Sequence, residues 1–167
     1  MTVKDCSPFE RSMPVVTELS YEAGVACVAL LGVSSSARTL VGAFSVLAAE
    51  HIPVLMIAYG ETAMDRHDIS IAIKEAHAAR AYRAFRSLAE QLSYQTLAEE
   101  TGLARISLSG VGMVSNPGVA SRMFIALQDV RATVRMLSTS EMKISCVIEG
   151  RLLHRAVRSV GKAFSVP

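Results

Sequence analysis

The residue types and spacings best suited to chemistry lie in one glycine-rich segment, residues 110–118, with the sequence GVGMVSNPG. Glycines let a ligand approach the backbone closely, and the free amides at the start of a following helix attract a carboxylate or phosphate. The segment is either such a cradle or a tight strand-to-helix turn, and its spacing fits both. Dinucleotide binding is disfavoured because the third glycine of G-x-G-x-x-G is displaced to Gly118.

Three other polar clusters are candidates for ligand or partner contacts. The run 138–143, with the sequence STSEMK, either lines a polar pocket or forms a bare turn between strands. The serines at 34–36, followed by Arg38, either bind an anion at a helix start or cap that helix. Cations at three- and four-residue steps near the C-terminus form either a solvated or a partner-binding face: Arg151, Arg155, Arg158 and Lys162.

The sequence contains no convincing catalytic or metal-binding set. Its four histidines have no carboxylate or cysteine at ligand spacing and are expected at the surface: His51, His67, His77 and His154. Its three cysteines lack a CxxC spacing and are expected to be reduced thiols, as in a cytoplasmic protein. We therefore expect no catalytic activity from this chain by itself, and no metal or cofactor.

The composition narrows the functional classes further. Of 167 residues, 51 % are apolar and 19 % are charged, which excludes a disordered chain. The net charge of +2 gives no electrostatic case for binding nucleic acid or an anionic membrane. The longest apolar run, residues 24–33, is about half of the ~20 residues that a spanning helix needs.

An internal repeat supplies the elements that must position these residues. Four pairs of segments recur in the same order: 28–33 with 106–111, Phe44 and Leu47 with Phe124 and Leu127, 54–56 with 134–136, and 69–73 with 144–148. Each half is predicted to be strand, helix, strand, strand, helix. Antiparallel strands with helices on one face predict an α+β fold of two ferredoxin-like βαββαβ units.

The second unit lacks a fourth strand after its last helix, whereas a spare extended segment, residues 13–19, precedes the first unit. We predict that this N-terminal segment completes the sheet of the second unit. The first domain is then residues 21–98, and the second is residues 13–20 plus 104–167. Residues 1–12 are expected to be flexible.

Residues 110–119 and 138–145, with 14–17 ahead of the first repeat, resemble the C-terminal regulatory region of aspartokinase. That region is a tandem pair of ACT domains, and the resemblance covers roughly residues 13–164. It implies a β-type regulatory subunit, a regulatory fragment or a free-standing relative, without the kinase domain. It also implies feedback control by lysine or threonine, dimerisation through ACT domains, and a possible catalytic subunit as partner.

In that family, effectors contact the loop and first helical turn after the first strand, together with the start of the second strand. The matching positions in the second repeat are Met113, Ser115, Asn116, Pro117, Gly118, Val119 and Ala120, then Thr133, Val134 and Arg135. In the first repeat they are Ser34, Ser35, Ser36, Thr39 and Leu40, then Pro53, Val54, Leu55 and Tyr59.

The chain departs from the family pattern at several of these positions. The usual Asp-x-Pro-Gly is replaced by SSAR at 35–38, Asn-x-Asp by PVL at 53–55, Gln-Asn by Tyr59-Gly60, and Asn-Ile-Glu by TVR at 133–135. Losing a charge-assisted contact to the effector's ammonium group costs on the order of 1.5–3 kcal/mol. Effector binding is therefore expected to be reduced, absent or changed in specificity. The alternatives are an interaction module that has lost its effector, or a sensor of a different small metabolite.

Overall fold

The computed structural model describes residues 15–34, 37–62, 65–111, 113, 116 and 118–166. Its elements, in chain order, are β1 (Glu18–Ser34), α1 (Ala37–Ala49), β2 (Val54–Glu61), β3 (Arg66–Lys74), α2 (Ala78–Ser87), α3 (Ala89–Leu92), β4 (Thr96–Ser109), α4 (Gly118–Asp129), β5 (Met136–Thr139), β6 (Lys143–Glu149) and α5 (Leu153–Phe164). Short 3-10 turns, Glu75–His77 and Gly150–Leu152, lead into α2 and α5. The predicted α+β class and the order of elements in both halves are confirmed.

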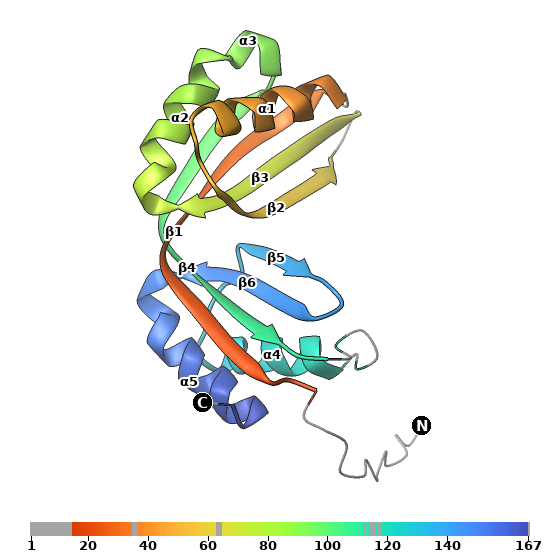
Figure 1. The fold of residues 1–167 in the computed structure, drawn as a ribbon, viewed down its shortest axis with the longest axis vertical. Coiled ribbons are helices and arrows are strands. Elements are labelled where there is room, and N and C mark those ends of the chain that lie inside the picture. Colours follow the sequence, from red (N-terminus) through yellow and green to blue (C-terminus); the bar gives the residue numbers. More distant parts are fainter. Residues whose placement is uncertain are drawn as a thin grey trace.

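The six strands form one antiparallel sheet in the order β2-β3-β1-β4-β6-β5. The long strands β1 and β4 run through both halves of the molecule, as Figure 1 shows. Helices α1 to α3 belong to the half that contains β2 and β3, and helices α4 and α5 to the half that contains β5 and β6. Each half therefore has its own helical layer on a shared sheet.

The register of β1 and β4 divides the sheet between the halves. Residues 18–23 of β1 pair with residues 104–109 of β4, which pair in turn with β6. Residues 25–34 of β1 pair with β3 and form the first of the four strands of the first half. Thr17 extends the pairing, because its amide donates to the Ser109 carbonyl at 2.8 Å. Residues 1–14 lie outside the described part of the chain, so the domain boundaries and the flexible N-terminus stay predictions.

Two glycines mark the junction where the long strands pass from one half to the other. Gly24 in β1 and Gly102 in β4 have φ of 67° and 70°, a backbone conformation that favours glycine. The β1–β4 ladder is irregular between Ala23 and Cys27, beside both glycines. Because bulges of this kind increase local twist, they reorient the strands between the two halves.

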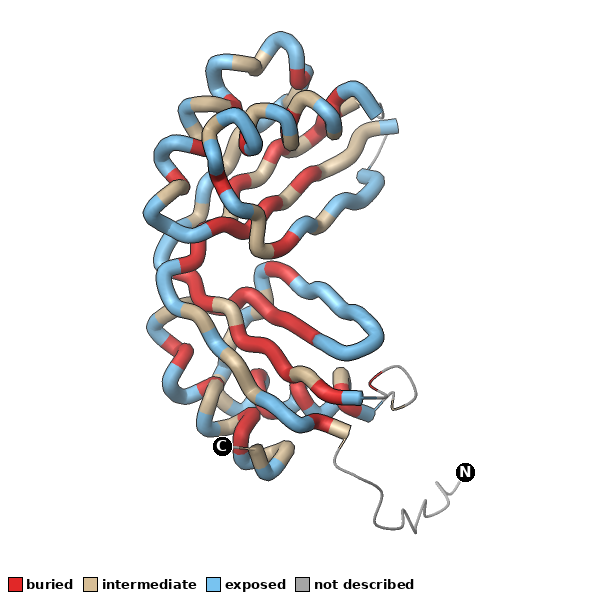
Figure 2. Tube along the Cα trace, in the orientation of Figure 1, coloured by how far each residue is buried: buried red, intermediate tan, exposed pale blue. Residues whose placement is uncertain are grey.

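Among the described residues, three apolar clusters hold the fold together, and Figure 2 shows them as buried segments along the central strands and inner helix faces. The first half packs around Phe85 and the second around Met123. The third cluster joins the halves and consists of Val25, Met56, Ala72, Leu103, Met136 and Val147. Cys27 lies against this third cluster, with its sulfur 3.6 Å from that of Met136. The junction is therefore a packed contact.

Several local expectations need correction. The single helix predicted at the end of the first half is divided, because Leu88 leaves the helical conformation (φ −109°, ψ 20°) between α2 and α3. The strand predicted from the repeated segment 134–136 begins only at Met136. His67 is half-buried, not a surface residue; its ring stacks on Tyr59, and its Nδ1 is buried without a hydrogen-bond partner among the described residues.

No helix in the described part of the chain is long and apolar enough to span a membrane. Within the same residues, the His, Cys, Asp and Glu side chains form no group of three or more that could hold a metal ion.

Candidate functional site

A cavity of about 290 Å³ lies in the second half, between the start of α4 and the β5–β6 turn. Its lining combines four residues of the glycine-rich loop and α4 with four from the end of β5, the turn and the start of β6: Met113, Asn116, Val119, Ala120, Thr139, Ser140, Lys143 and Ile144. The volume suits a ligand of amino-acid size, since larger ligands occupy roughly 300–1,000 Å³.

Local packing holds the ends of the glycine-rich loop beside this cavity. A side chain at Gly110 would place its Cβ 1.7 Å from the Val15 carbonyl oxygen, so only glycine fits against the N-terminal segment there. The Gly110 amide donates to the Met142 carbonyl at 2.9 Å, which ties the loop to the β5–β6 turn. Farther along, the Val119 amide donates to the Asn116 carbonyl at 3.0 Å. The loop is therefore held at both ends.

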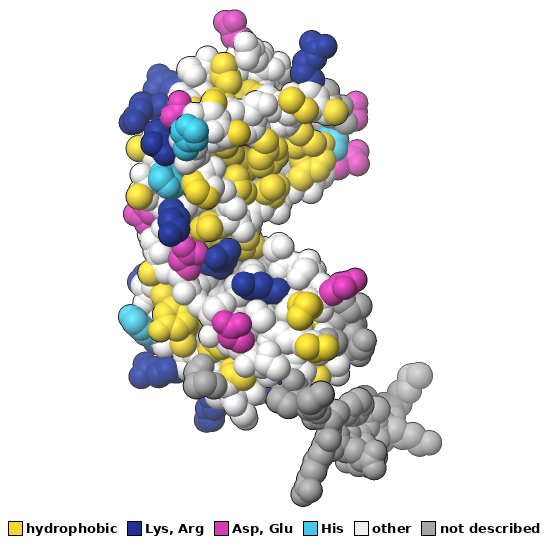
Figure 3. Space-filling view, in the orientation of Figure 1, with side chains coloured by type: hydrophobic (Ala, Val, Ile, Leu, Met, Phe, Trp, Pro, Cys, Tyr) yellow, Lys and Arg dark blue, Asp and Glu magenta, His cyan; other side chains and the backbone are white. Residues whose placement is uncertain are grey.

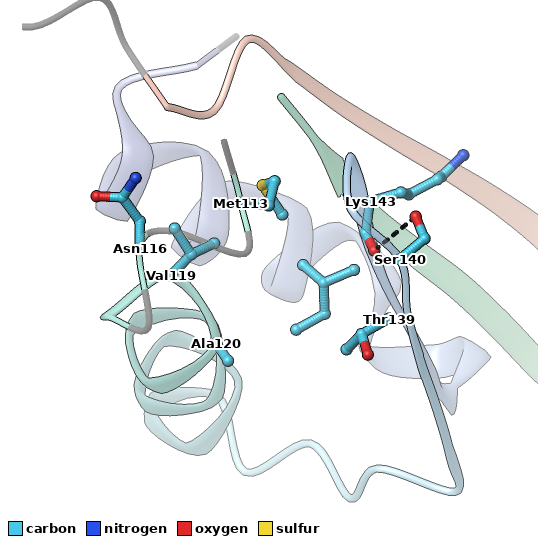
Figure 4. Close-up of a pocket in the computed structure, with 8 residues that line it drawn as sticks. Met113, Asn116, Val119, Ala120, Thr139, Ser140 and Lys143 are labelled. Atoms are coloured by element: carbon cyan, nitrogen blue, oxygen red, sulfur yellow. Dashed lines mark hydrogen bonds between the residues drawn. The ribbon is translucent and has the colours of Figure 1, made fainter. Parts of the chain in front are cut away.

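Figure 4 shows how the lining side chains are arranged. Met113 and Val119 are buried and form an apolar wall opposite Thr139 and Ser140. The Ser140 hydroxyl donates to the Lys143 carbonyl at 3.4 Å, whereas the Lys143 side chain extends away from the other labelled side chains. No carboxylate of a described residue lines the cavity. It offers hydroxyls, carbonyls and apolar surface, while the α4 N-terminus favours a negative group.

The structure places most of the second-repeat loop residues at this cavity. Met113, Asn116, Val119 and Ala120 line it. Gly118 is the first residue of α4 and lines a neighbouring cavity of about 310 Å³ together with Asn116. Ser115 and Pro117 lie outside the described residues.

Thr133, Val134 and Arg135 lie elsewhere, just before β5 at the junction between the halves. The Thr133 amide donates to Glu149 Oε2 at 2.9 Å. Partial burial by itself would raise the pKa of Glu149. Hydrogen bonds from its own amide and from Thr133, together with the positive charge of Arg135, outweigh the effect of burial and lower the pKa of Glu149. Arg135 Nε donates to Glu100 Oε1 at 2.9 Å. Both polar residues therefore have partners within the chain.

The first-repeat loop residues lie at the far end of the first half. The Ser34 and Thr39 hydroxyl oxygens are 3.2 Å apart, and Thr39 is buried. Leu40 packs against the core of that half. Ser35 and Ser36 lie outside the described residues.

The first-repeat strand residues are divided between the junction and the sheet edge. Pro53 precedes β2, and Val54 and Leu55 begin it; the Leu55 carbonyl accepts a hydrogen bond from Arg105 Nη1 at 3.4 Å. Tyr59 is on the β2 edge, 45 % exposed, with its ring stacked on His67 at 4.8 Å between centroids and 9° between planes. Stacking thus orients Tyr59 against the sheet.

Within the described ranges, the predicted loop contacts and strand contacts of each repeat do not come together within a single chain. At the start of β2, Val54 pairs with Ile73 of β3, which pairs in turn with Ala26 of β1. At the end of β2, Glu61 pairs with His67 of β3, which pairs in turn with Val33 of β1. The eight-residue strand β2, about 26 Å long at ~3.3 Å per residue, separates the loop from the strand start. Instead, β2 and β5 are in contact across the junction, where Met56 and Met136 share one cluster.

Four lining residues were absent from the predicted contacts: Thr139, Ser140, Lys143 and Ile144. The sequence signal for this part of the lining was the hydroxyl-rich run at 138–143, which was compatible with either a polar pocket or a bare turn between strands. The cavity supports the pocket interpretation for the second half.

Comparison with known proteins agrees with this architecture. The family model described as "ACT domain" matches residues 106–164. The chain is 34 % identical to an aspartokinase of Bacillus sp. (strain MGA3), covering 91 % of this chain and 37 % of the relative. It is 32 % identical to aspartokinase 2 of Bacillus subtilis (strain 168), covering 98 % of this chain and 40 % of the relative. The chain thus spans about two fifths of the length of these curated relatives.

Among solved structures, the chain is similar to the ligand-free regulatory subunit of aspartate kinase from Thermus thermophilus. The TM-score is 0.82 at 28 % identity, and the match covers 90 % of this chain and 99 % of that one. Sequence and fold agree over nearly the whole chain. They identify it as a homologue of the C-terminal regulatory region of aspartokinase, with the tandem ACT fold.

Proposed function

We propose that this chain is a regulatory subunit or regulatory region of aspartate kinase, acting in the cytoplasm and sensing an end-product amino acid of the lysine or threonine type. The homology to aspartokinase regulatory regions supports the role. The observation that carries the sensing function is the cavity beside α4, because four of the predicted effector contacts line it. The α4 N-terminus would attract the α-carboxylate, and hydroxyls and carbonyls would receive the ammonium group.

We further propose that the complete site forms between two copies of the chain. The outer strands β2 and β5 have unpaired edges in the single chain. Apolar side chains are exposed on these strands and on the adjacent helices: Val41, Ile57, Tyr59, Phe124, Ile125 and Leu137. Exposed edges and apolar patches of this kind favour association.

Antiparallel pairing of β2 from one chain with β5 from its partner explains the separated residue sets. It would place the loop of each unit beside the strand start of the partner's unit, which one chain cannot do. Lysine or threonine would then bind between the first unit of one chain and the second unit of the other. Light scattering should give a homodimer, and a monomer at high protein concentration would contradict this arrangement.

Effector binding can be tested by thermal shift, because a ligand that binds the folded state raises its apparent stability. Lysine or threonine should raise the Tm of the wild-type chain. Ala120→Leu fills the cavity beside α4 and should abolish that rise. Ala48→Leu, an exposed position on α1 away from the cavity, should respond as wild type does. An undiminished response in Ala120→Leu would contradict the site.

A second candidate function is an ACT interaction module that has lost effector binding. It is favoured by the junction contacts, because the Leu55 carbonyl and the Arg135 side chain, both at predicted effector positions, already have partners within the chain. This candidate predicts no rise in Tm with any amino acid, together with dimerisation or retained binding to a catalytic subunit.

A further inference from the structure

The cations of this chain are concentrated on two helices that are equivalent in the two repeats. Helix α2 carries three Lys or Arg residues, and α5 with the 3-10 turn before it carries four. We call these seven residues the basic edge: Arg80, Arg83, Arg86, Arg151, Arg155, Arg158 and Lys162. Neither helix contains Asp or Glu. The basic edge holds seven of the 17 Lys and Arg residues, so the other residues carry ten cations against 15 acids. The two helices are therefore strongly cationic, although the net charge of the chain is small.

All seven side chains of the basic edge are exposed. Only Arg80 takes part in an ion pair within the described residues, a long contact of 3.7 Å with Glu50. The carboxylates nearest the junction have other partners: Glu22 pairs with Arg105, Glu75 accepts from the Gly102 amide, and Glu149 accepts from the Thr133 amide. The fold therefore leaves most of the cationic charge of the basic edge available to a partner.

The two helices lie on the same side of the molecule. Both α2 and α5 pack against the shared strands β1 and β4, one on each side of the junction. Figure 3 shows Lys and Arg side chains along the left margin, where Figure 1 places α2 and α5. At 1.5 Å per residue the helices are about 15 and 18 Å long. A surface of this length fits a macromolecule better than a small anion.

We infer that the basic edge is a docking surface for a carboxylate-rich face of another protein, an interaction beyond the proposed effector sensing. Six of its seven cations are arginines, whose planar guanidinium groups bind carboxylates with two parallel hydrogen bonds. Arginine is also enriched at protein interfaces, whereas lysine is depleted.

Nucleic acid fits this surface less well. Phe85 of α2 is buried, and Tyr82 and Phe164 are half-buried, so neither helix presents a fully exposed aromatic ring for base stacking. The excess of acids on the rest of the chain would also repel a phosphate backbone that extended past the basic edge.

The test uses the full chain, without effector, and fluorescence anisotropy of labelled poly-L-glutamate as the probe. Two double variants remove the same charge from each helix, Arg83→Gln/Arg86→Gln on α2 and Arg155→Gln/Arg158→Gln on α5. Each should weaken binding roughly five-fold, because every exposed pair contributes modestly. The matched control, Lys74→Gln/Arg131→Gln, removes two exposed cations that lie outside the basic edge and should leave binding nearly unchanged.

Three outcomes would overturn the inference. The first is absence of poly-L-glutamate binding at low ionic strength. The second is an equal loss in the control and the edge variants, which would indicate a general charge effect. The third is binding of single-stranded DNA of equal charge at least as tight as that of poly-L-glutamate at physiological ionic strength, which would assign the surface to nucleic acid. None of these readouts depends on lysine or threonine, so they are separate from the test of effector binding.

Discussion

Arg105 and Glu22 form an ion pair between β4 and β1, with 2.8 Å between Arg105 Nη2 and Glu22 Oε2. The same guanidinium donates through Nη1 to the Leu55 carbonyl at the start of β2. Both charged side chains are only about a quarter exposed, at 24 % and 26 %. One arginine therefore connects three strands across the junction between the ACT units.

Arg105→Gln should lower the free energy of unfolding by about 1–3 kcal/mol, because it leaves partly buried acceptors without their charged donor. Urea denaturation measures the change. Glu100→Gln is the matched control: it breaks the Arg135–Glu100 pair, whose side chains are 38 % and 44 % exposed, and should cost less than about 1 kcal/mol. Equal losses in the two variants would show that Arg105 has no special role at the junction.

Removing the N-terminal strand should destabilise the second unit. A chain that begins at Tyr21 lacks Val16, which is 4 % exposed in the second core, and Leu19, which packs against that core and pairs with Leu108. Burying each such side chain contributes about 1.5–3 kcal/mol, so we expect a loss of several kcal/mol relative to a chain that begins at Val15. A chain from Tyr21 that unfolds at the same urea concentration would contradict the shared-sheet architecture.

The sequence predicted the fold well because both repeats present the same alternation of apolar residues. Ile69, Ile71 and Ile73 all face the first core, as their spacing predicts, and the repeat assigned equivalent elements to the second half. What the pattern does not encode is the length of β1 and β4. Their continuity depends on bulges at Gly24 and Gly102, and a glycine in a sequence equally predicts the end of a strand.

The candidate site was predicted less completely, for geometric reasons. The loop around Asn116 could be recognised from its glycines and its place before a helix. The contribution of Thr139 depends on how the β5–β6 turn folds back toward α4, which is a tertiary relationship. In the same way, the hydrogen bond from Arg135, just before β5, to Glu100 of β4 joins residues 35 positions apart. No local spacing predicts that pair.

The Ser107 and Ser145 hydroxyls form a buried pair on adjacent strands β4 and β6, with their oxygens 2.8 Å apart. They are 2 % and 7 % exposed. Ser107→Ala should cost about 1–3 kcal/mol, because it leaves the buried Ser145 hydroxyl unpaired. The double variant Ser107→Ala/Ser145→Ala should cost clearly less than the sum of the two single variants in urea denaturation. Additive losses would mean that each hydroxyl has another partner in the folded state.

Cys146 should be inert in the folded chain. Burial raises the pKa of its thiol to about 12, so it remains protonated at neutral pH, and the thiolate is the reactive form. Burial, with the charge of Glu100, also raises the pKa of Cys27. Alkylation followed by peptide mass spectrometry should label Cys146 only after urea unfolding. Rapid labelling of Cys146 in the native chain would show that this part of the second core opens readily.

Glu149 should make stability depend on pH in the acid range. Its folded-state pKa is lowered, as described for its contact with Thr133, so its stabilising contribution is present above the pKa of the unfolded chain. That contribution is lost as the pH falls through the folded-state pKa. The wild-type chain should therefore exceed Glu149→Gln in urea midpoint at pH 7, and the difference should shrink below the ordinary carboxylate value of about 4.3. Glu141→Gln, which removes an exposed carboxylate from the β5–β6 turn, corrects for the change in net charge. A difference that stayed constant down to pH 3 would mean that the ionised carboxylate of Glu149 is not what holds the Thr133 backbone at the start of β5.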